Sequence, residues 1–117
     1  MIDLTNFCFF TIKNNFQEYE KIESKLLFGK RMESPLVSIM IPTFLRNKFL
    51  KETIDSAIHQ TTNVEYEVVV IDNNPDYENK DTLSVVQRNE NKILSYYKNY
   101  ENLGMFGNWN RCLELAN

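Results

Sequence analysis

Two nearly unbroken apolar runs, at residues 37–41 and 67–71, predict two buried strands. A strand with one face in water alternates apolar and polar residues. These runs do not alternate, which is typical of strands that are covered on both faces. Pro42 should end the first strand, because proline has no N–H to donate to a neighbouring strand. The second run leads directly into Asp72 and the turn-forming residues 73–75. Both strands are therefore expected to open into loops at their carboxyl ends.

Helical periodicity separates these strands and follows them. The apolar side chains of residues 47–60 fall on one face of a helix: Leu50, Ile54, Ala57 and Ile58. Residues 79–89 and 108–116 predict two further helices, and residues 93–97 predict a third short strand. Strands that alternate with helices at this spacing indicate an α/β fold, with a Rossmann-like parallel sheet, helices on both faces and right-handed crossovers.

Residues 1–34 differ from the rest of the chain and are expected to form an N-terminal helical extension with a linker. Asn15, followed three residues later by Glu18, matches a capping box. Apolar residues then recur at helical spacing, which predicts an amphipathic helix over residues 16–28 that ends at Gly29. We expect this extension to pack on the main domain or on a partner.

Composition and charge narrow the classes of function. With 117 residues, 43% of them hydrophobic, the chain can form one small domain with a packed core. Its formal charge of −3 disfavours nucleic acid as a partner, because nucleic-acid-binding domains present a basic surface. No stretch approaches the ~20 apolar residues of a membrane span, and the N-terminus lacks the features of a signal peptide. A cytoplasmic location is therefore expected, with peripheral association at the inner face of the membrane as an alternative.

The residues that most often bind metals or act as nucleophiles are sparse. Cys8 and Cys112 form no CxxC pair and are expected to be reduced thiols, Cys112 in the core. His59 is the single histidine, so a His/Cys metal site is not expected. No Ser/His/Asp or Cys/His set and no suitably spaced pair of carboxylates is evident, so catalytic residues stay unassigned.

Three loops are expected to meet at the carboxyl edge of the sheet, at residues 42–47, 72–76 and 99–107. Asp72 directly follows the second strand, and its carboxylate could accept a hydrogen bond from a ring N–H such as a uracil imide. Such a bond contributes roughly 1.5–3 kcal/mol, enough to select one base over another. The alternative, which residue type alone favours, is that Asp72 only caps its own turn.

Several residues could contact a phosphate, and each of them also has a purely structural interpretation. Gly104, two residues after Asn102, either supplies a positive φ before a helix or lets the backbone approach a phosphate. Arg46 and Arg111 are candidate phosphate ligands, although most arginines are simply solvated. Neither GxGxxG nor GxxxxGK[ST] occurs, so the dinucleotide and P-loop interpretations lose their main support.

The chain from about residue 36 to residue 117 resembles the N-terminal half of the family-2 glycosyltransferases, which have the GT-A fold. Three segments carry the resemblance: VSIMIPTFLRNKFLKETIDSAIHQT, YEVVVIDNNPD and ENLGMFGNWNRCLELAN. They contain a strand ending in Pro-Thr-aromatic, a helix ending in Ser-x-x-x-Gln-Thr and a strand ending in Asp. An Asn-x-Gly loop and a helix with an early asparagine follow. The order and spacing of these pieces make the resemblance strong.

The resemblance implies a nucleotide-sugar site, with a UDP-sugar as the expected donor. Its predicted residues are Pro42, Thr43, Phe44, Arg46, Asp72, Asn102, Gly104 and Asn110. Residues 42–44 would line the base and ribose pocket, Asp72 would hydrogen-bond the base, and residues 102–104 would shape the loop beside the nucleotide. Trp109 stands where many members have an arginine that touches the nucleotide, and Leu45 replaces a common asparagine.

The resemblance also implies what lies elsewhere in such enzymes. A DxD-type motif that holds Mg²⁺ or Mn²⁺, the acceptor site and the catalytic base come later in family members. Residues 35–117 are therefore expected to be the donor half of a GT-A domain, truncated before the DxD motif, in a parent enzyme of polysaccharide biosynthesis. The chain alone should lack metal ligands and transferase activity. Because strand 37–41 would then have a free edge, the fragment is expected to dimerise, to exchange a segment with a second copy, or to cover that edge with residues 1–34.

Two other functions remain open. One is a non-catalytic binding or assembly module that keeps the GT-A-like fold. The weaker one is another nucleotide-binding α/β domain such as a nucleotidyltransferase, which would normally have a glycine-rich basic loop where residues 42–48 have no glycine. Binding of UDP, with GDP as a control, separates the donor-binding segment of a glycosyltransferase from the non-catalytic module.

Overall fold

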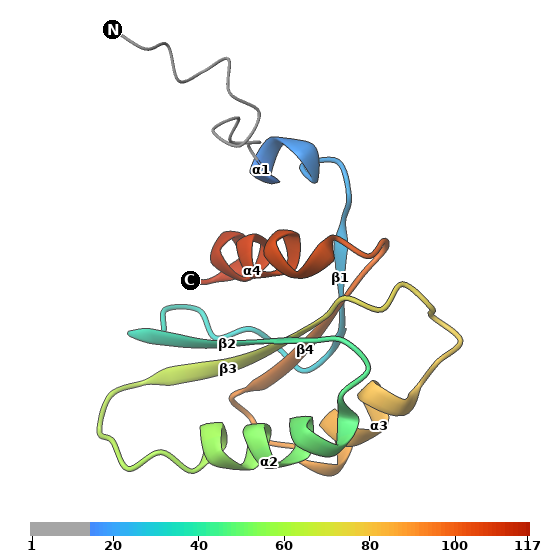
Figure 1. Cartoon of the computed structure of the whole chain (residues 1–117). Helices are drawn as coiled ribbons and strands as arrows, with labels where there is room; N and C mark the ends of the chain where they lie inside the picture. Colours follow the sequence, from blue (N-terminus) through green and yellow to red (C-terminus); the bar gives the residue numbers. More distant parts are fainter. Residues whose placement is uncertain (1–14) are drawn as a thin grey trace, which may run out of the picture.

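The computed structural model describes residues 15–117, in which helices and strands alternate along the chain (Figure 1). The elements are α1 (Asn15–Glu18), β1 (Ser24–Phe28), β2 (Val37–Thr43), α2 (Asn47–Ile58), β3 (Tyr66–Asp72), α3 (Asp81–Arg88), β4 (Leu94–Asn99) and α4 (Gly104–Leu115). The strands form one sheet in the order β1-β4-β3-β2. No helix in this part of the chain has the length and hydrophobicity of a membrane span.

The apolar run at residues 67–71 forms the middle of the sheet. Strand β3 pairs in parallel with β2 on one side and with β4 on the other, and its residues 68–71 are fully buried. The register places Thr43 of β2 opposite Asp72, and Asp72 opposite Lys98 of β4. The prediction of three parallel strands with aligned carboxyl ends is confirmed.

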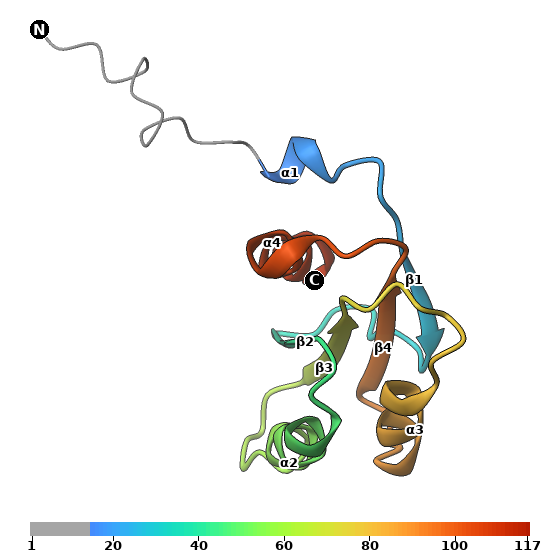
Figure 2. The ribbon, with the colours of Figure 1, turned by 45° about the vertical axis from the view of Figure 1, so that its right-hand side comes forward.

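Side chains alternate along β3 between two apolar layers, because successive residues of a strand point to opposite faces. Val68 and Val70 face α2 and α3, in a core that also contains Ile54 and Val86. Val69 and Ile71 face α4, where Cys112 packs as a free, buried thiol. Figures 1 and 2 show α4 on one side of the sheet and α2 with α3 on the other. Helices on both faces were predicted, as was the buried Cys112.

Pro42 does not end its strand, which continues to Thr43. Strand β2 is the edge strand of the sheet formed by residues 15–117, and one side of an edge strand needs no N–H donors. Proline is therefore compatible with the ladder at this position, where Pro42 lies opposite Ile71.

The prediction of a helix over residues 16–28 is wrong. Helix α1 ends at Glu18, and residues 24–28 form β1, which pairs antiparallel with β4. A helix this short depends on packing rather than on its own propensity, and the open edge of β4 offers backbone partners instead. Gly29, with a φ of +79°, follows β1 where a Cβ would lie only 2.2 Å from the carbonyl oxygen of Leu94.

The strand β1 lies at the edge of the sheet opposite to β2. The described residues of the N-terminal segment therefore do not cover the edge of β2, as had been expected for residues 1–34. The part of that expectation that concerns residues 1–14, with Cys8, lies outside the described residues. Dimerisation through the edge of β2 stays a prediction.

Candidate functional site

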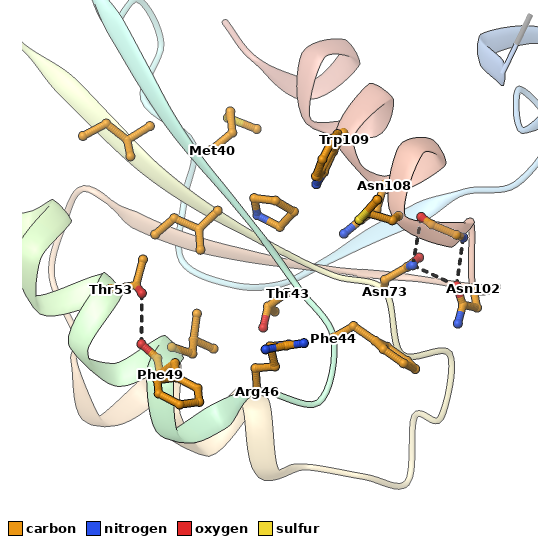
Figure 3. A pocket seen from close by; sticks show the side chains of 16 residues that line it. Met40, Thr43, Phe44, Arg46, Phe49, Thr53, Asn73, Asn102, Asn108 and Trp109 are labelled. Atoms are coloured by element: carbon orange, nitrogen blue, oxygen red, sulfur yellow. Dashed lines mark hydrogen bonds between the residues drawn. The ribbon is translucent and has the colours of Figure 1, made fainter.

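A pocket of about 770 Å³ lies at the carboxyl end of β2, between the first turns of α2 and α4 (Figure 3). This volume is typical of small-molecule sites. The pocket reaches both faces of the β2 edge. Figure 3 shows Met40 and Trp109 on the α4 side, Phe49 and Thr53 on the α2 side, and Thr43 between them. The parallel register brings these residues together, because it aligns the loops that follow β2 and β3.

Most of the predicted site residues line this pocket. They are Pro42, Thr43, Phe44, Arg46, Asn102 and Gly104. Two predicted residues, Asp72 and Asn110, are not among its lining residues. The pocket therefore gathers the loop after β2 and the start of α4, as expected from the sequence, although it excludes the carboxylate that had been assigned to the base.

The pocket lining has one charged side chain, the guanidinium of Arg46, and no carboxylate among the residues that the structure describes. Arg46 is exposed and forms no ion pair with residues 15–117. It is also the N-cap residue of α2, whose positive end faces the same region. The pocket therefore carries positive charge in a protein whose net formal charge is −3.

Helix α4 also begins at the pocket, with Gly104 as its first residue at a φ of +73°. No side chain caps the N-terminus of α2 or α4 through the N-cap residue, although at α4 the N–H of Gly104 donates to Oδ1 of Asn102 at 2.8 Å. Backbone N–H groups at a helix start favour negative charge. The electrostatics of the pocket therefore favour an anionic ligand.

A network of asparagine amides holds the loops around the pocket in place. Asn73 donates from Nδ2 to Oδ1 of Asn102 at 2.8 Å, and its own Oδ1 accepts from the N–H of Leu103 at 2.8 Å. Asn99 donates from Nδ2 to Oδ1 of Asn73 at 3.0 Å and to Oδ1 of Asn108 at 2.9 Å. Because an amide both donates and accepts, these side chains satisfy one another without a net charge.

Three members of this network were missed in the sequence: Asn73, Asn99 and Asn108. Asn73 and Asn99 directly follow or end neighbouring parallel strands, and this placement was the available signal. Asparagine is common in turns, so the residue type alone did not distinguish a buried network from ordinary loops.

Asp72 is fully buried below the loops and does not reach the pocket. Its Oδ1 accepts from the N–H of Asn74 at 2.9 Å, so the turn-capping alternative describes this oxygen correctly. Its Oδ2 accepts from the hydroxyl of Tyr96 at 2.6 Å and from Lys98 Nζ at 3.3 Å. Asp72 shares the face of β3 that carries Val68 and Val70, which explains its contact with the Tyr96 core layer.

The environment of Asp72 also perturbs Tyr96. Burial raises the pKa of the Tyr96 phenol, and the hydrogen bond to Asp72 raises it further. Tyr96 therefore remains a neutral donor to the carboxylate. The predicted contact between Asp72 and a base needs a rearrangement of this buried cluster, because every carboxylate oxygen has a protein partner here.

Asn110 is replaced in the pocket by Asn108, which is buried and lies in the same helix. Residues two positions apart in an α-helix point about 200° away from each other, so only one of the two can face the pocket. Trp109 does line the pocket and is 48% exposed. Its ring meets the Phe106 ring edge-on at 5.4 Å between centroids.

Metal binding finds no support among residues 15–117. No three His, Cys, Asp or Glu side chains gather there in a way that could hold an ion. The described part of the pocket therefore does not fit a divalent cation on its own.

Comparisons with known proteins show similarity to glycosyltransferases. The profile of Glycosyl transferase family 2 matches residues 38–117. An uncharacterized glycosyltransferase of Methanocaldococcus jannaschii is 30% identical over 86 residues, which cover 73% of this chain and 29% of that protein. Chondroitin synthase of Pasteurella multocida is 32% identical over 91 residues, which cover 78% of this chain and 9% of that protein.

The chain thus spans less than a third of the length of these curated relatives. No solved structure matches it. The profile match covers every residue that lines the pocket. The chain belongs to glycosyl transferase family 2.

Proposed function

We propose that the pocket at the carboxyl end of β2 binds the nucleoside diphosphate of a nucleotide-sugar donor, with a UDP-sugar as the first candidate. Membership in the family implies a nucleotide-sugar donor and an acceptor. The observation that carries the proposal is the charge of the lining, which contains Arg46 and, among the described residues, no carboxylate. The parent protein would transfer the sugar to a glycan or polysaccharide acceptor.

The apolar walls suit a planar base and a ribose. Phe44 and Trp109 are half-exposed aromatic side chains in the lining, and Pro42 and Met105 add apolar surface. Aromatic rings favour flat ligands by stacking and by covering apolar surface. Thr43 and the asparagine network would supply the polar contacts that orient the ligand.

The diphosphate would lie near Arg46 and the start of α2. A guanidinium forms charge-assisted hydrogen bonds to phosphate oxygens, often with two N–H groups at once. The uncapped helix start adds backbone donors and the positive end of the helix dipole. Arg46 and α2 together therefore provide the countercharge that a diphosphate needs.

In this proposal, the ligands of a divalent cation and the catalytic base for sugar transfer come from other residues. We infer that any Mg²⁺ or Mn²⁺ on the diphosphate takes its protein ligands from outside residues 15–117, because the described residues do not fit such an ion. No carboxylate lines the described pocket to act as a base, so the 117-residue chain should bind the donor without transferring the sugar.

Calorimetric titration of the chain with UDP tests the proposal, with GDP and uridine as further ligands. Saturable UDP binding is expected, and Arg46→Ala should weaken it about tenfold while leaving uridine binding nearly unchanged, because the lost hydrogen bonds are to charged oxygens. Lys48→Ala is the matched control: it removes an exposed cation two residues away that does not line the pocket.

Absence of saturable binding by either nucleotide would contradict the proposal and favour the alternative of a non-catalytic assembly module. Equal losses in the Arg46 and Lys48 variants would show that general charge, rather than the pocket, attracts the ligand. Release of free sugar from a UDP-sugar by the purified chain would contradict the inference about chemistry.

A further inference from the structure

Residues 19–32, which we name the strap, hold α4 although they precede the segment that matches the family. Arg111 of α4 donates from Nη1 to the hydroxyl of Ser24 and from Nη2 to the carbonyl oxygen of Tyr19, the latter at 2.9 Å. The Tyr19 ring lies against Gly107, where a Cβ would be 2.8 Å from it. The strap therefore grips one face of the helix through its side chains and its backbone.

The strap also holds the end of α4. Arg31 donates from Nη2 to the carbonyl oxygen of Leu115 at 2.6 Å, and Asn117 donates to the carbonyl oxygen of Met32 at 2.9 Å. Arg31 is anchored in turn by an ion pair of 2.6 Å with the buried Glu67 of β3. The helix is thus fixed at two points along its length.

The strap contacts Gly107 and Arg111, which adjoin the pocket-lining Asn108 on the surface of α4 and point away from the other lining residues Met105 and Trp109. Gly107 and Arg111 are one turn apart, and so are Met105 and Trp109 of the pocket lining. Two positions along a helix turn the side chain by about 200°, so these pairs point in nearly opposite directions. A displacement of the strap would therefore move the pocket wall.

The hydroxyl of Ser24 also connects the strap to the asparagine network. It donates to Oδ1 of Asn99 at 2.6 Å while it accepts from Arg111. This leaves Nδ2 of Asn99 directed at Oδ1 of Asn73 and of Asn108. If the Asn99 amide flipped, its oxygen would face two other acceptor oxygens, so the Ser24 hydrogen bond selects the orientation that joins the network.

We propose that Ser24 is a positioning residue of the donor site. Through Asn99 it orients Asn73 and Asn108, both of which line the pocket, so a strap outside the family-matched segment sets the affinity for the donor. The inference rests on the proposed nucleotide binding, but its structural part can be measured without a ligand.

Ser24→Ala in the 117-residue chain tests the inference. UDP affinity should fall about three- to tenfold, the effect of losing one hydrogen bond, at a temperature where urea unfolding shows the variant to be fully folded. The ¹⁵N side-chain amide resonances of Asn73, Asn99 and Asn108 should shift. Ser24→Thr keeps the hydroxyl and should restore both readouts.

Ser84→Ala is the matched control, because it removes a hydroxyl that donates only to the carbonyl oxygen of Lys80 within α3. It should leave the affinity and the three amides unchanged. If Ser24→Ala fails to fold, Ser24→Cys carries the same test with a weaker donor.

Unchanged amide resonances in Ser24→Ala would overturn the positioning role, whether or not UDP binds. Shifted amides with unchanged UDP affinity would overturn the link to the donor site. If the wild-type chain binds no nucleotide, the proposed function fails, and the amide shifts alone then decide whether Ser24 orients the network.

Discussion

The ammonium of Lys98 lies 3.3 Å from the carboxylate of Asp72 in the interior of the protein, where the two side chains are 2% and 0% exposed. The two residues are direct partners in the ladder between β3 and β4. The Tyr96 hydroxyl donates to the same carboxylate oxygen, and the Tyr77 ring lies 5.7 Å from the ammonium. This buried pair joins the carboxyl ends of two strands below the loops that form the pocket.

Breaking this pair should strongly destabilise the protein. Lys98→Met leaves the Asp72 carboxylate buried without its cation, which costs about 3–5 kcal/mol of the free energy of unfolding. Lys51→Met removes the partner of Asp55 in an exposed pair, 63% and 44% exposed, and should cost less than about 1 kcal/mol. Urea unfolding of both variants measures the difference. Equal losses would show that burial of the pair has no energetic consequence.

Two glycines with positive φ should respond differently to alanine. At Gly29, with φ +79°, a Cβ would lie 2.2 Å from the Leu94 carbonyl oxygen, so Gly29→Ala must displace β1 from β4. At Gly104, with φ +73°, nothing lies within 4 Å of the added Cβ, so only backbone strain of about 1 kcal/mol is expected. Gly29→Ala should cost more than about 2 kcal/mol.

Thermal or urea unfolding of the two alanine variants checks this ranking. Both variants add the same methyl group on backbone of nearly the same φ, so the comparison separates steric contact from backbone strain. A larger loss at Gly104 than at Gly29 would contradict the close packing of β1 on β4.

The parallel sheet could be predicted from the sequence because its signal is local. The run at residues 67–71 is apolar from Val68 onward, and its position between helical segments indicated an interior strand. The six predicted residues that line the pocket were implied by the resemblance to family-2 glycosyltransferases, and they lie at the carboxyl edge where the loops of such a sheet meet.

The remaining features depend on contacts between distant residues. Residues 24–28 become a strand because β4, about 70 positions later, offers them an unpaired edge. Ser24 and Asn99 form a hydrogen bond although they are 75 positions apart in the sequence, and neither residue type predicts this contact. Asp72 was placed in the crevice because its buried partner Lys98 could not be inferred from the sequence around it.

Acid should destabilise the protein through Glu67. Burial acts to raise the pKa of this carboxyl, but hydrogen bonds from Arg31 and Ser38 outweigh it, so the pKa lies below its ordinary value of 4.5. Because the pKa is lower in the folded protein than in the unfolded chain, the stabilisation is present above pH 4.5 and is lost as the pH falls through the folded value.

Urea unfolding between pH 3 and pH 7 measures this contribution in the wild type and in Glu67→Gln. The variant should be less stable at pH 7, where it lacks the ion pair with Arg31, and its stability should depend less on pH below about 4.5. Glu78→Gln, at an exposed position, is the matched control and should keep the wild-type dependence. Parallel curves for Glu67→Gln and the wild type would contradict the assignment.

Leu45 should be a site where a polar residue stabilises the protein. It has a φ of +52°, although it is not glycine, and its side chain is 55% exposed beside the pocket. Left-handed backbone costs most residues about 1–2 kcal/mol, whereas asparagine tolerates it, so Leu45→Asn should raise the free energy of unfolding by about 0.5–1 kcal/mol. Leu113→Asn, at a 69% exposed position in the last turn of α4, makes the same chemical change on helical backbone and should be slightly destabilising. Urea unfolding compares the two, and a destabilised Leu45→Asn would show that packing of this leucine outweighs its backbone strain. Because Leu45 does not line the pocket, UDP affinity should stay unchanged in the same variant.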